Sequence, residues 1–183
     1  MATQPSYPLL RAEDFLDIDF GERKAELDNG VIRMMAGGTR RHAQVSGNIS
    51  TGLNLKSARY TACGSRLALR THDRSVRFAD VAIYPLQPDA ANDDQTFVDD
   101  PVVIVEVLSA GTARTDLRIK LEEYRELPSV DTIVFVDIAT ERLRIIQRTG
   151  PAGWNDVMHT EAVDVALPSL GLTLPHAEIF ARD

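Results

Sequence analysis

The strongest constraint on the fold is a nearly continuous apolar run at residues 102–108, Val-Val-Ile-Val-Glu-Val-Leu. A strand that is covered on both faces has this composition, whereas a strand with one wet face alternates apolar and polar residues. Residues 132–138 form a second such run. Two strands buried on both faces predict a sheet with helices packed against it, and therefore a mixed α/β fold.

The elements around these two strands follow from periodicity and turn residues. Asn29-Gly30 accepts the positive φ angles of a tight turn, so residues 25–28 and 31–34 are predicted to form a hairpin. Apolar spacings of three and four predict helices over residues 40–57 and about 113–127. Further strands are expected at residues 60–70, 76–84 and 142–148, and in the tail near 154–159 and 172–174.

These elements assemble into one predicted domain. Their order is helix, three strands, helix, strand, an αβββαβ core with an N-terminal hairpin in front and antiparallel strands behind. The chain has 183 residues, of which 44% are apolar, and a chain of this size buries roughly 70% of its unfolded surface in a single core. We therefore expect a single domain over residues 1–183, in which residues 1–24 form an N-terminal arm.

Composition also bears on where the protein works. No apolar run approaches the roughly 18 residues that span a bilayer. The first residues lack the basic segment and apolar stretch of a secretory signal. Cys63 is the single cysteine, which excludes a disulfide framework and suits a reducing compartment. We expect a cytoplasmic protein with no membrane attachment.

Charge is unevenly distributed along the chain. The formal net charge is −7, yet residues 40–79 contain eight basic side chains and one acidic side chain. Such a block either meets phosphate groups or forms a solvated surface. Its members are Arg40, Arg41, Lys56, Arg59, Arg66, Arg70, Arg74 and Arg77.

Two acidic residues interrupt segments that otherwise look buried. Glu106 lies inside the 102–108 run, and Asp80 is flanked by apolar residues within the 76–84 strand. An ionised carboxylate in a dry interior is costly unless it is paired, neutralised or bound to metal. If the strands are neighbours, the two carboxylates converge and favour Mg²⁺ or Mn²⁺. The alternative is an ion pair with one of the seventeen arginines.

Lys120 is one of only three lysines in the chain, with Lys24 and Lys56. It lies one helical turn after Asp116 and one turn before Tyr124, so the three share a flank of the second helix. An ordinary surface Asp–Lys pair explains the first spacing equally well.

Taken together, these segments resemble the Uma-type restriction endonuclease family, within the PD-(D/E)XK nuclease superfamily. The resemblance covers roughly residues 25–180. Its pieces are Glu26-Leu-Asp-Asn-Gly30, His42, Ala79-Asp80-Val81, Pro101-Val-Val-Ile-Val-Glu-Val-Leu-Ser109, the series Thr112, Asp116, Lys120 and Tyr124, Val130-Asp-Thr-Ile-Val-Phe-Val-Asp137, Leu167-Pro-Ser-Leu-Gly-Leu172 and Glu178-Ile-Phe180.

The resemblance implies a restriction-endonuclease-like fold and metal-dependent hydrolysis of DNA phosphodiester bonds. Asp80, Glu106 and the backbone carbonyl of Val107 would hold Mg²⁺ or Mn²⁺, with Glu26 approaching from the hairpin. Lys120 would assist the attacking water. The superfamily places a lysine two residues after the catalytic glutamate, where this chain has Leu108, and a proline where it has Ala79. The resemblance implies that a lysine from the following helix, here Lys120, replaces the missing one.

The resemblance also implies supporting residues and partners. His42, Asp116, Tyr124, Arg40 and Arg41 are expected to support the site or contact phosphate. DNA is the expected partner, and a homodimer is expected because cutting two strands requires two sites.

Two other functions fit the residues. A binding or scaffold module would keep the nuclease fold without activity, in which case an arginine would pair with Glu106 and Lys120 would point away. A two-carboxylate glycoside hydrolase would set Asp80 and Glu106 across an open cleft, with no role for Lys120. The geometry around Lys120 distinguishes the three.

Overall fold

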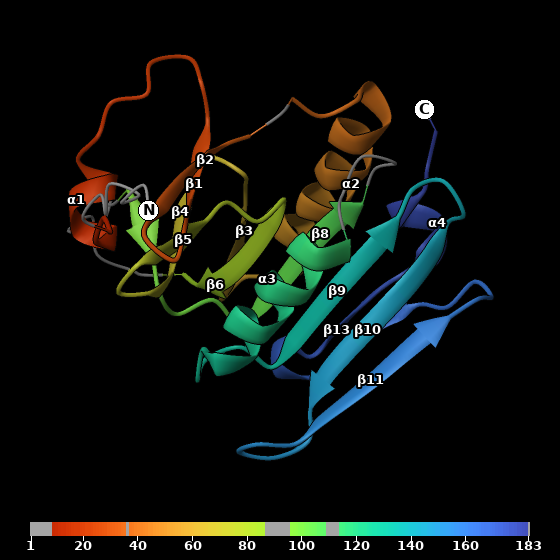
Figure 1. Cartoon of the computed structure of the whole chain (residues 1–183). Helices are drawn as coiled ribbons and strands as arrows, with labels where there is room; N and C mark the ends of the chain where they lie inside the picture. Colours follow the sequence, from red (N-terminus) through yellow and green to blue (C-terminus); the bar gives the residue numbers. More distant parts are fainter. Residues whose placement is uncertain (1–8, 36, 87–95, 109–113, 183) are drawn as a thin grey trace.

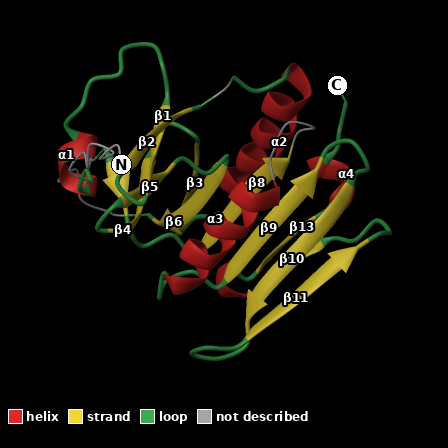
Figure 2. Ribbon diagram, viewed as in Figure 1, coloured by secondary structure: helices red, strands yellow, loops and turns green. Residues whose placement is uncertain are grey.

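The computed structural model of the chain describes residues 9–35, 37–86, 96–108 and 114–182, without the side chains of residues 114–116. Its centre is a six-stranded mixed sheet (Figures 1 and 2). The strands are β3 (Tyr60–Gly64), β6 (Val81–Pro85), β8 (Val103–Leu108), β9 (Thr132–Asp137), β10 (Arg142–Arg148) and β11 (Trp154–His159). Their order in the sheet is β11-β10-β9-β8-β6-β3, and only β8 and β9 are parallel.

Two helices cover opposite faces of this sheet (Figure 2). The helix α2 (Arg40–Lys56) begins at Thr39, whose hydroxyl accepts a hydrogen bond from the His42 backbone N–H, and it buries Val45, Ile49 and Leu53. The helix α3 (Arg114–Glu126) packs Leu121 and Tyr124 on the other face. The α2-β3-β6-β8-α3-β9 order confirms the predicted αβββαβ core.

A second sheet lies beside the first and carries the predicted hairpin (Figure 1). Its strands are β1 (Ala25–Asp28), β2 (Val31–Met34), β4 (Ala68–His72), β5 (Ser75–Arg77) and β7 (Phe97–Val98), in the order β2-β1-β5-β4-β7. Asn29 and Gly30 have φ angles of 45° and 83°, as a tight hairpin turn requires. The short helix α1 (Ala12–Leu16) packs on this sheet through Phe15.

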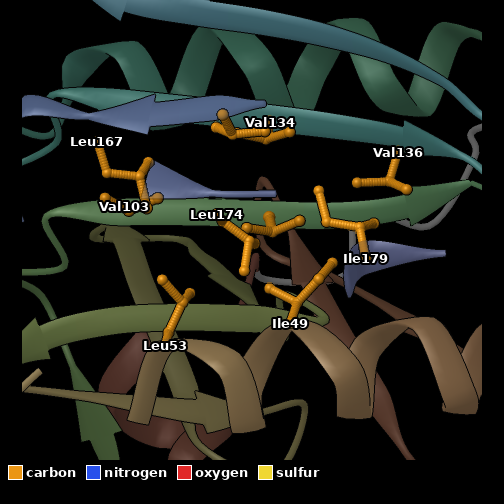
Figure 3. Close-up of a pocket in the computed structure, with 10 residues that line it drawn as sticks. Ile49, Leu53, Val103, Val134, Val136, Leu167, Leu174 and Ile179 are labelled. Atoms are coloured by element: carbon orange, nitrogen blue, oxygen red, sulfur yellow. The ribbon is translucent and has the colours of Figure 1, made fainter. Parts of the chain in front are cut away.

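The end of the chain closes the α2 face of the central sheet. It contains β12 (Val165–Leu167), a 3₁₀ turn (Pro168–Leu170), β13 (Leu172–Leu174) and α4 (His176–Ile179). An apolar cavity lies between α2, the central strands and this tail, and its ten lining residues carry no polar side chain (Figure 3). β13 was predicted near residues 172–174, whereas β12 and α4 were not predicted.

Two predicted strands are wrong in the same way. Residues 60–70 and 76–84 each divide into two strands that belong to different sheets. The first divides at a turn in which the Gly64 carbonyl accepts the Arg66 N–H. The second divides at residues 78–80, which belong to no strand. The chain therefore passes from one sheet to the other immediately before β6 begins.

Among the described residues, none of the helices has the length and apolar character that crossing a membrane requires.

Candidate active site

Asp80 lies at the break between β5 and β6. Because Val81 pairs with Val105, the residue before Val81 lies beside Glu106. The Asp80 carboxylate Oδ2 accepts a hydrogen bond of 2.7 Å from the Val107 N–H, and the His42 Nε2 lies 3.1 Å from the same oxygen. Asp80 and Glu106 are therefore neighbours because Asp80 directly precedes the paired residues of β6 and β8. Alternation within a continuous strand over residues 76–84 is not the cause.

Glu106 faces α3 from the middle of the central sheet and is 6% exposed. The Tyr124 hydroxyl donates to Glu106 Oε1 at 2.5 Å, and Lys120 Nζ lies 3.3 Å from the same oxygen. Lys120 and Tyr124 are one turn apart on α3, so the flank predicted from their spacing is the flank that faces Glu106. In the described part of the chain, its charged partner is this lysine and not an arginine.

The hairpin supplies a third carboxylate. Glu26 Oε1 accepts hydrogen bonds from Lys120 Nζ at 2.9 Å and from the Phe78 backbone N–H at 3.1 Å. Lys120 thus joins Glu26 of β1 to Glu106 of β8, and all three side chains are more than nine-tenths buried. The site forms where the two sheets and α3 meet.

Burial sets the ionisation of this cluster. Burial, with the charges of Asp80 and Glu26, raises the pKa of Glu106 to about 7 against the opposing effects of the Lys120 charge and the Tyr124 hydrogen bond. The hydrogen bond to Asp80 raises the pKa of His42. Burial, followed by the adjacent Glu106 charge, raises the pKa of the Tyr124 hydroxyl. Glu106 therefore gains or loses its charge near neutral pH, within a cluster of interacting ionisable groups.

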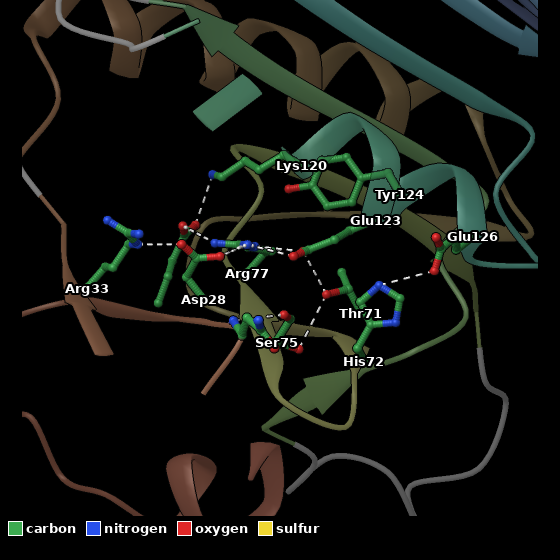
Figure 4. Close-up of polar contacts among 12 residues, drawn as sticks. Asp28, Arg33, Thr71, His72, Ser75, Arg77, Lys120, Glu123, Tyr124 and Glu126 are labelled. Atoms are coloured by element: carbon green, nitrogen blue, oxygen red, sulfur yellow. Dashed lines mark hydrogen bonds and ion pairs between the residues drawn. The ribbon is translucent and has the colours of Figure 1, made fainter. Parts of the chain in front are cut away.

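Arg77 does not lie on a phosphate-binding surface. Its side chain is fully buried at the end of β5, where it donates to both carboxylate oxygens of Glu123 at 2.7 and 2.6 Å and to Asp28 at 2.9 Å (Figure 4). Arg77 therefore fits neither alternative given for the basic block, phosphate contact or a solvated surface, because its side chain has no exposed surface and is paired with Glu123 and Asp28. Glu123 and Asp28 were missed, although Glu26-Leu27-Asp28 alternation signals two carboxylates on one face.

The remaining predicted residues have different surroundings. Arg41 donates to the carbonyl oxygens of Phe180 and Ala181 at 2.9 and 3.1 Å, so it holds the end of the chain. Arg40 is exposed at the start of α2. Asp116 lies in α3, but its side chain is outside the described residues.

A ready-made metal cage is absent from the described residues. No three His, Cys, Asp or Glu side chains among them are close enough to hold an ion together. Asp80 is turned toward His42 and Val107, whereas Glu106 and Glu26 are turned toward Lys120. The predicted ligands Asp80, Glu106, Glu26 and the Val107 carbonyl therefore stay a prediction.

Comparison with known proteins places this site in a family. The family model of Uma2, described as "Putative restriction endonuclease", matches residues 12–177. The chain belongs to the Uma2 family. The match includes the hairpin, both carboxylate-bearing segments and α3, so the resemblance drawn from the sequence motifs is confirmed.

Two individual proteins are similar to this chain. An uncharacterized protein of Synechocystis sp. (strain PCC 6803), sll1609, is 28% identical over 134 residues, which span 72% of this chain and 76% of that protein. The crystal structure of a "putative nuclease belonging to DUF820" from Anabaena variabilis matches with a TM-score of 0.75. It is 17% identical, and the match covers 93% of this chain and 97% of that one. The predicted restriction-endonuclease-like fold is confirmed.

Proposed function

We propose that this protein is a divalent-metal-dependent endonuclease that hydrolyses DNA phosphodiester bonds. Asp80 and Glu106 are the proposed Mg²⁺ or Mn²⁺ ligands, with the Val107 carbonyl and Glu26, and Lys120 is the proposed cation beside the attacking water. The observation that carries the proposal is the contact of Lys120 with both Glu106 and Glu26. We infer that Lys120, from α3, takes the role that the superfamily gives to a lysine at the position of Leu108.

The donor set fits a hard divalent cation. Carboxylate and carbonyl oxygens are the ligands that Mg²⁺ and Mn²⁺ prefer. A strand residue turns its N–H and its C=O to the same side, so the Val107 N–H that donates to Asp80 indicates that its carbonyl also points toward Asp80. The raised pKa of Glu106 reflects burial and carboxylate crowding, which a bound cation relieves.

The residues divide the chemistry among them. A bound Mg²⁺ or Mn²⁺ supplies a water of lowered pKa and neutralises charge on the phosphate. The Lys120 ammonium, already held between two carboxylates, orients that water and stabilises charge on the phosphate oxygens. Tyr124 fixes the Glu106 rotamer through its hydroxyl. His42 fixes Asp80 and, at 20% side-chain exposure, offers its ring to the approaching phosphate.

The two other functions receive less support. A binding module without activity predicts an arginine on Glu106 and a lysine that points away, whereas Glu106 has Lys120 at 3.3 Å. A glycoside hydrolase predicts an open cleft between two free carboxyl groups, whereas Glu106 is more than nine-tenths buried and bonded to Tyr124.

Metal binding is the first test. Mn²⁺ titrated by calorimetry into the wild type is expected to bind, and Asp80→Asn and Glu106→Gln are each expected to abolish binding with the circular dichroism spectrum retained. Glu178→Gln is the matched control, because Glu178 also pairs with a lysine, Lys56, but at the exposed surface. Absence of Mn²⁺ and Mg²⁺ binding to the wild type would refute the metal mechanism.

Cleavage is the second test. Supercoiled plasmid is expected to be nicked or linearised in the presence of Mg²⁺ or Mn²⁺, and Lys120→Met is expected to lose about 100-fold or more of this rate, typical of a positioned charge. Lys24→Met, which replaces an exposed lysine outside the basic block, is expected to keep full activity. Equal activity of both lysine variants would remove Lys120 from the mechanism. Light scattering of the same samples tests the expected homodimer.

A further inference from the structure

We propose that Arg77 is a positioning residue of the nuclease site, which clamps the β1–β2 hairpin to α3 and so holds Glu26 against Lys120. The inference rests on the proposed function for its catalytic meaning. It assigns to a buried arginine a role that neither the family resemblance nor the basic block suggested.

The guanidinium of Arg77 spans the gap between the hairpin and the helix. On the helix side, Nε and Nη2 donate to the two carboxylate oxygens of Glu123, in the bidentate geometry that is strongest for this pair. On the hairpin side, Nη2 donates to Asp28, and Nη1 lies 3.5 Å from Glu26 Oε2. One planar group therefore hydrogen-bonds the carboxyl groups of Glu123 on α3 and Asp28 on β1, and its Nη1, which makes no hydrogen bond in the described part of the chain, adds an ion-pair contact with Glu26.

The positions of its partners carry this clamp to the proposed catalytic residues. Glu26 and Asp28 are alternate residues of β1 and share one face of that strand. Glu123 lies one turn after Lys120 on α3 (Figure 4), so a clamp on Glu123 also fixes the position of Lys120 relative to the hairpin. Without the clamp, Glu26 would keep its bonds to Lys120 and to the Phe78 backbone N–H, but β1 would lose its side-chain link to α3 through Asp28 and Glu123.

Burial makes the clamp specific for arginine. The Arg77 side chain has no exposed surface, so water does not replace a lost hydrogen bond there. Burial alone would lower the pKa of Arg77, but Glu123, Asp28 and Glu26 raise it. A lysine ammonium is a compact charge without the planar set of donors of a guanidinium. It therefore cannot hydrogen-bond Glu123 and Asp28 in the same geometry.

The experiment uses the small number of lysines. Lys120 is buried between two carboxylates, whereas Lys24 and Lys56 lie closer to the surface and serve as internal standards. Acetylation of each lysine is followed by mass spectrometry on the full chain. Arg77→Met is expected to speed Lys120 acetylation about tenfold relative to both standards, the factor for losing about one charged hydrogen bond.

A matched arginine separates positioning from general stability. Arg148 holds the other end of α3 through the carbonyl oxygens of Leu127 and Arg125, at 2.8 and 3.2 Å, and its hydrogen bonds within the described part of the chain do not involve Glu26. Arg148→Met is expected to leave the relative Lys120 rate unchanged. The inference is overturned if Arg77→Met leaves the Lys120 rate unchanged, or if Arg148→Met raises it equally.

A second variant covers the case in which Arg77→Met unfolds. Arg77→Met combined with Glu123→Leu replaces the buried ion pair by apolar side chains, which often preserves stability, and it is judged by the same labelling criteria.

Measurement of Mn²⁺ binding separates this inference from the proposed function. Arg77→Met is expected to weaken Mn²⁺ binding about tenfold, and to cause no further loss in a Glu26→Gln background, because Arg77 acts through Glu26. Normal Mn²⁺ binding by Arg77→Met would overturn the inference and leave the proposed function intact. A wild type that binds no Mn²⁺ would refute the proposed function, whereas the labelling result would still decide the role of Arg77.

Discussion

Replacing Glu106 with glutamine is predicted to stabilise the fold at alkaline pH while it abolishes the proposed activity. The pKa of Glu106 is raised from 4.5 to about 7 by burial and by neighbouring carboxylates. Glutamine keeps the shape, and its carbonyl oxygen still accepts from Tyr124 and Lys120. It removes only the charge, which is the part that the folded state disfavours.

The sign and size follow from proton linkage. Between pH 4.5 and about 7, the folded wild type keeps a proton that the unfolded chain releases, so its free energy of unfolding falls as pH rises through this window. The shift corresponds to about 3 kcal/mol in total. Glu106→Gln lacks this titration. Its stability relative to the wild type is therefore predicted to rise by about 3 kcal/mol between acid and alkaline pH.

Urea unfolding followed by circular dichroism at about pH 4.5 and about pH 8.5 measures this difference. Glu178→Gln is the control, because Glu178 is 46% exposed and is expected to show little change between the two conditions. If Glu106→Gln loses more stability at about pH 8.5 than at about pH 4.5, the charged form of Glu106 is stabilised in the fold as an ion-pair partner of Lys120. That result would refute the interpretation of Glu106 as a costly functional carboxylate.

Three further predictions concern the surroundings of the site. Asp80→Asn is expected to lower the raised pKa of His42 toward 6.5, measured by NMR titration of the imidazole, and an unchanged pKa would contradict the pairing. Because the pKa of His42 is raised in the folded protein, the His42–Asp80 pair stabilises the fold below pH 6.5. This contribution is lost as pH rises through the folded-state pKa. Gly38→Ala would place a Cβ 3.0 Å from His42 Nδ1, so we expect a several-fold loss of plasmid cleavage with an unchanged melting temperature; full activity would show that the ring position is unimportant. Gly30→Ala is expected to cost about 1–3 kcal/mol of stability in urea, because its φ is +83° and its Cβ would lie 2.7 Å from that of Leu9; an unchanged midpoint would refute the turn strain.

Local patterns determined most of the secondary structure. The hairpin at Asn29-Gly30 was predictable because few residue pairs accept two positive φ angles. The helix from Arg40 to Lys56 was predictable because Thr39 caps it and its apolar residues repeat every three or four positions. Glu106 was also conspicuous, since a charge inside an apolar strand needs a reason.

The tertiary structure alone decided how the site is assembled. Nothing in residues 76–84 shows that the chain changes sheets before Asp80, because that break is set by packing between the two sheets. Arg77 reads as one more surface arginine until Asp28 and Glu123 are brought around it, 49 and 46 positions away in sequence. Periodicity identifies which side chains are buried, but the partners of a buried charge come from distant segments, so only the folded chain decides them.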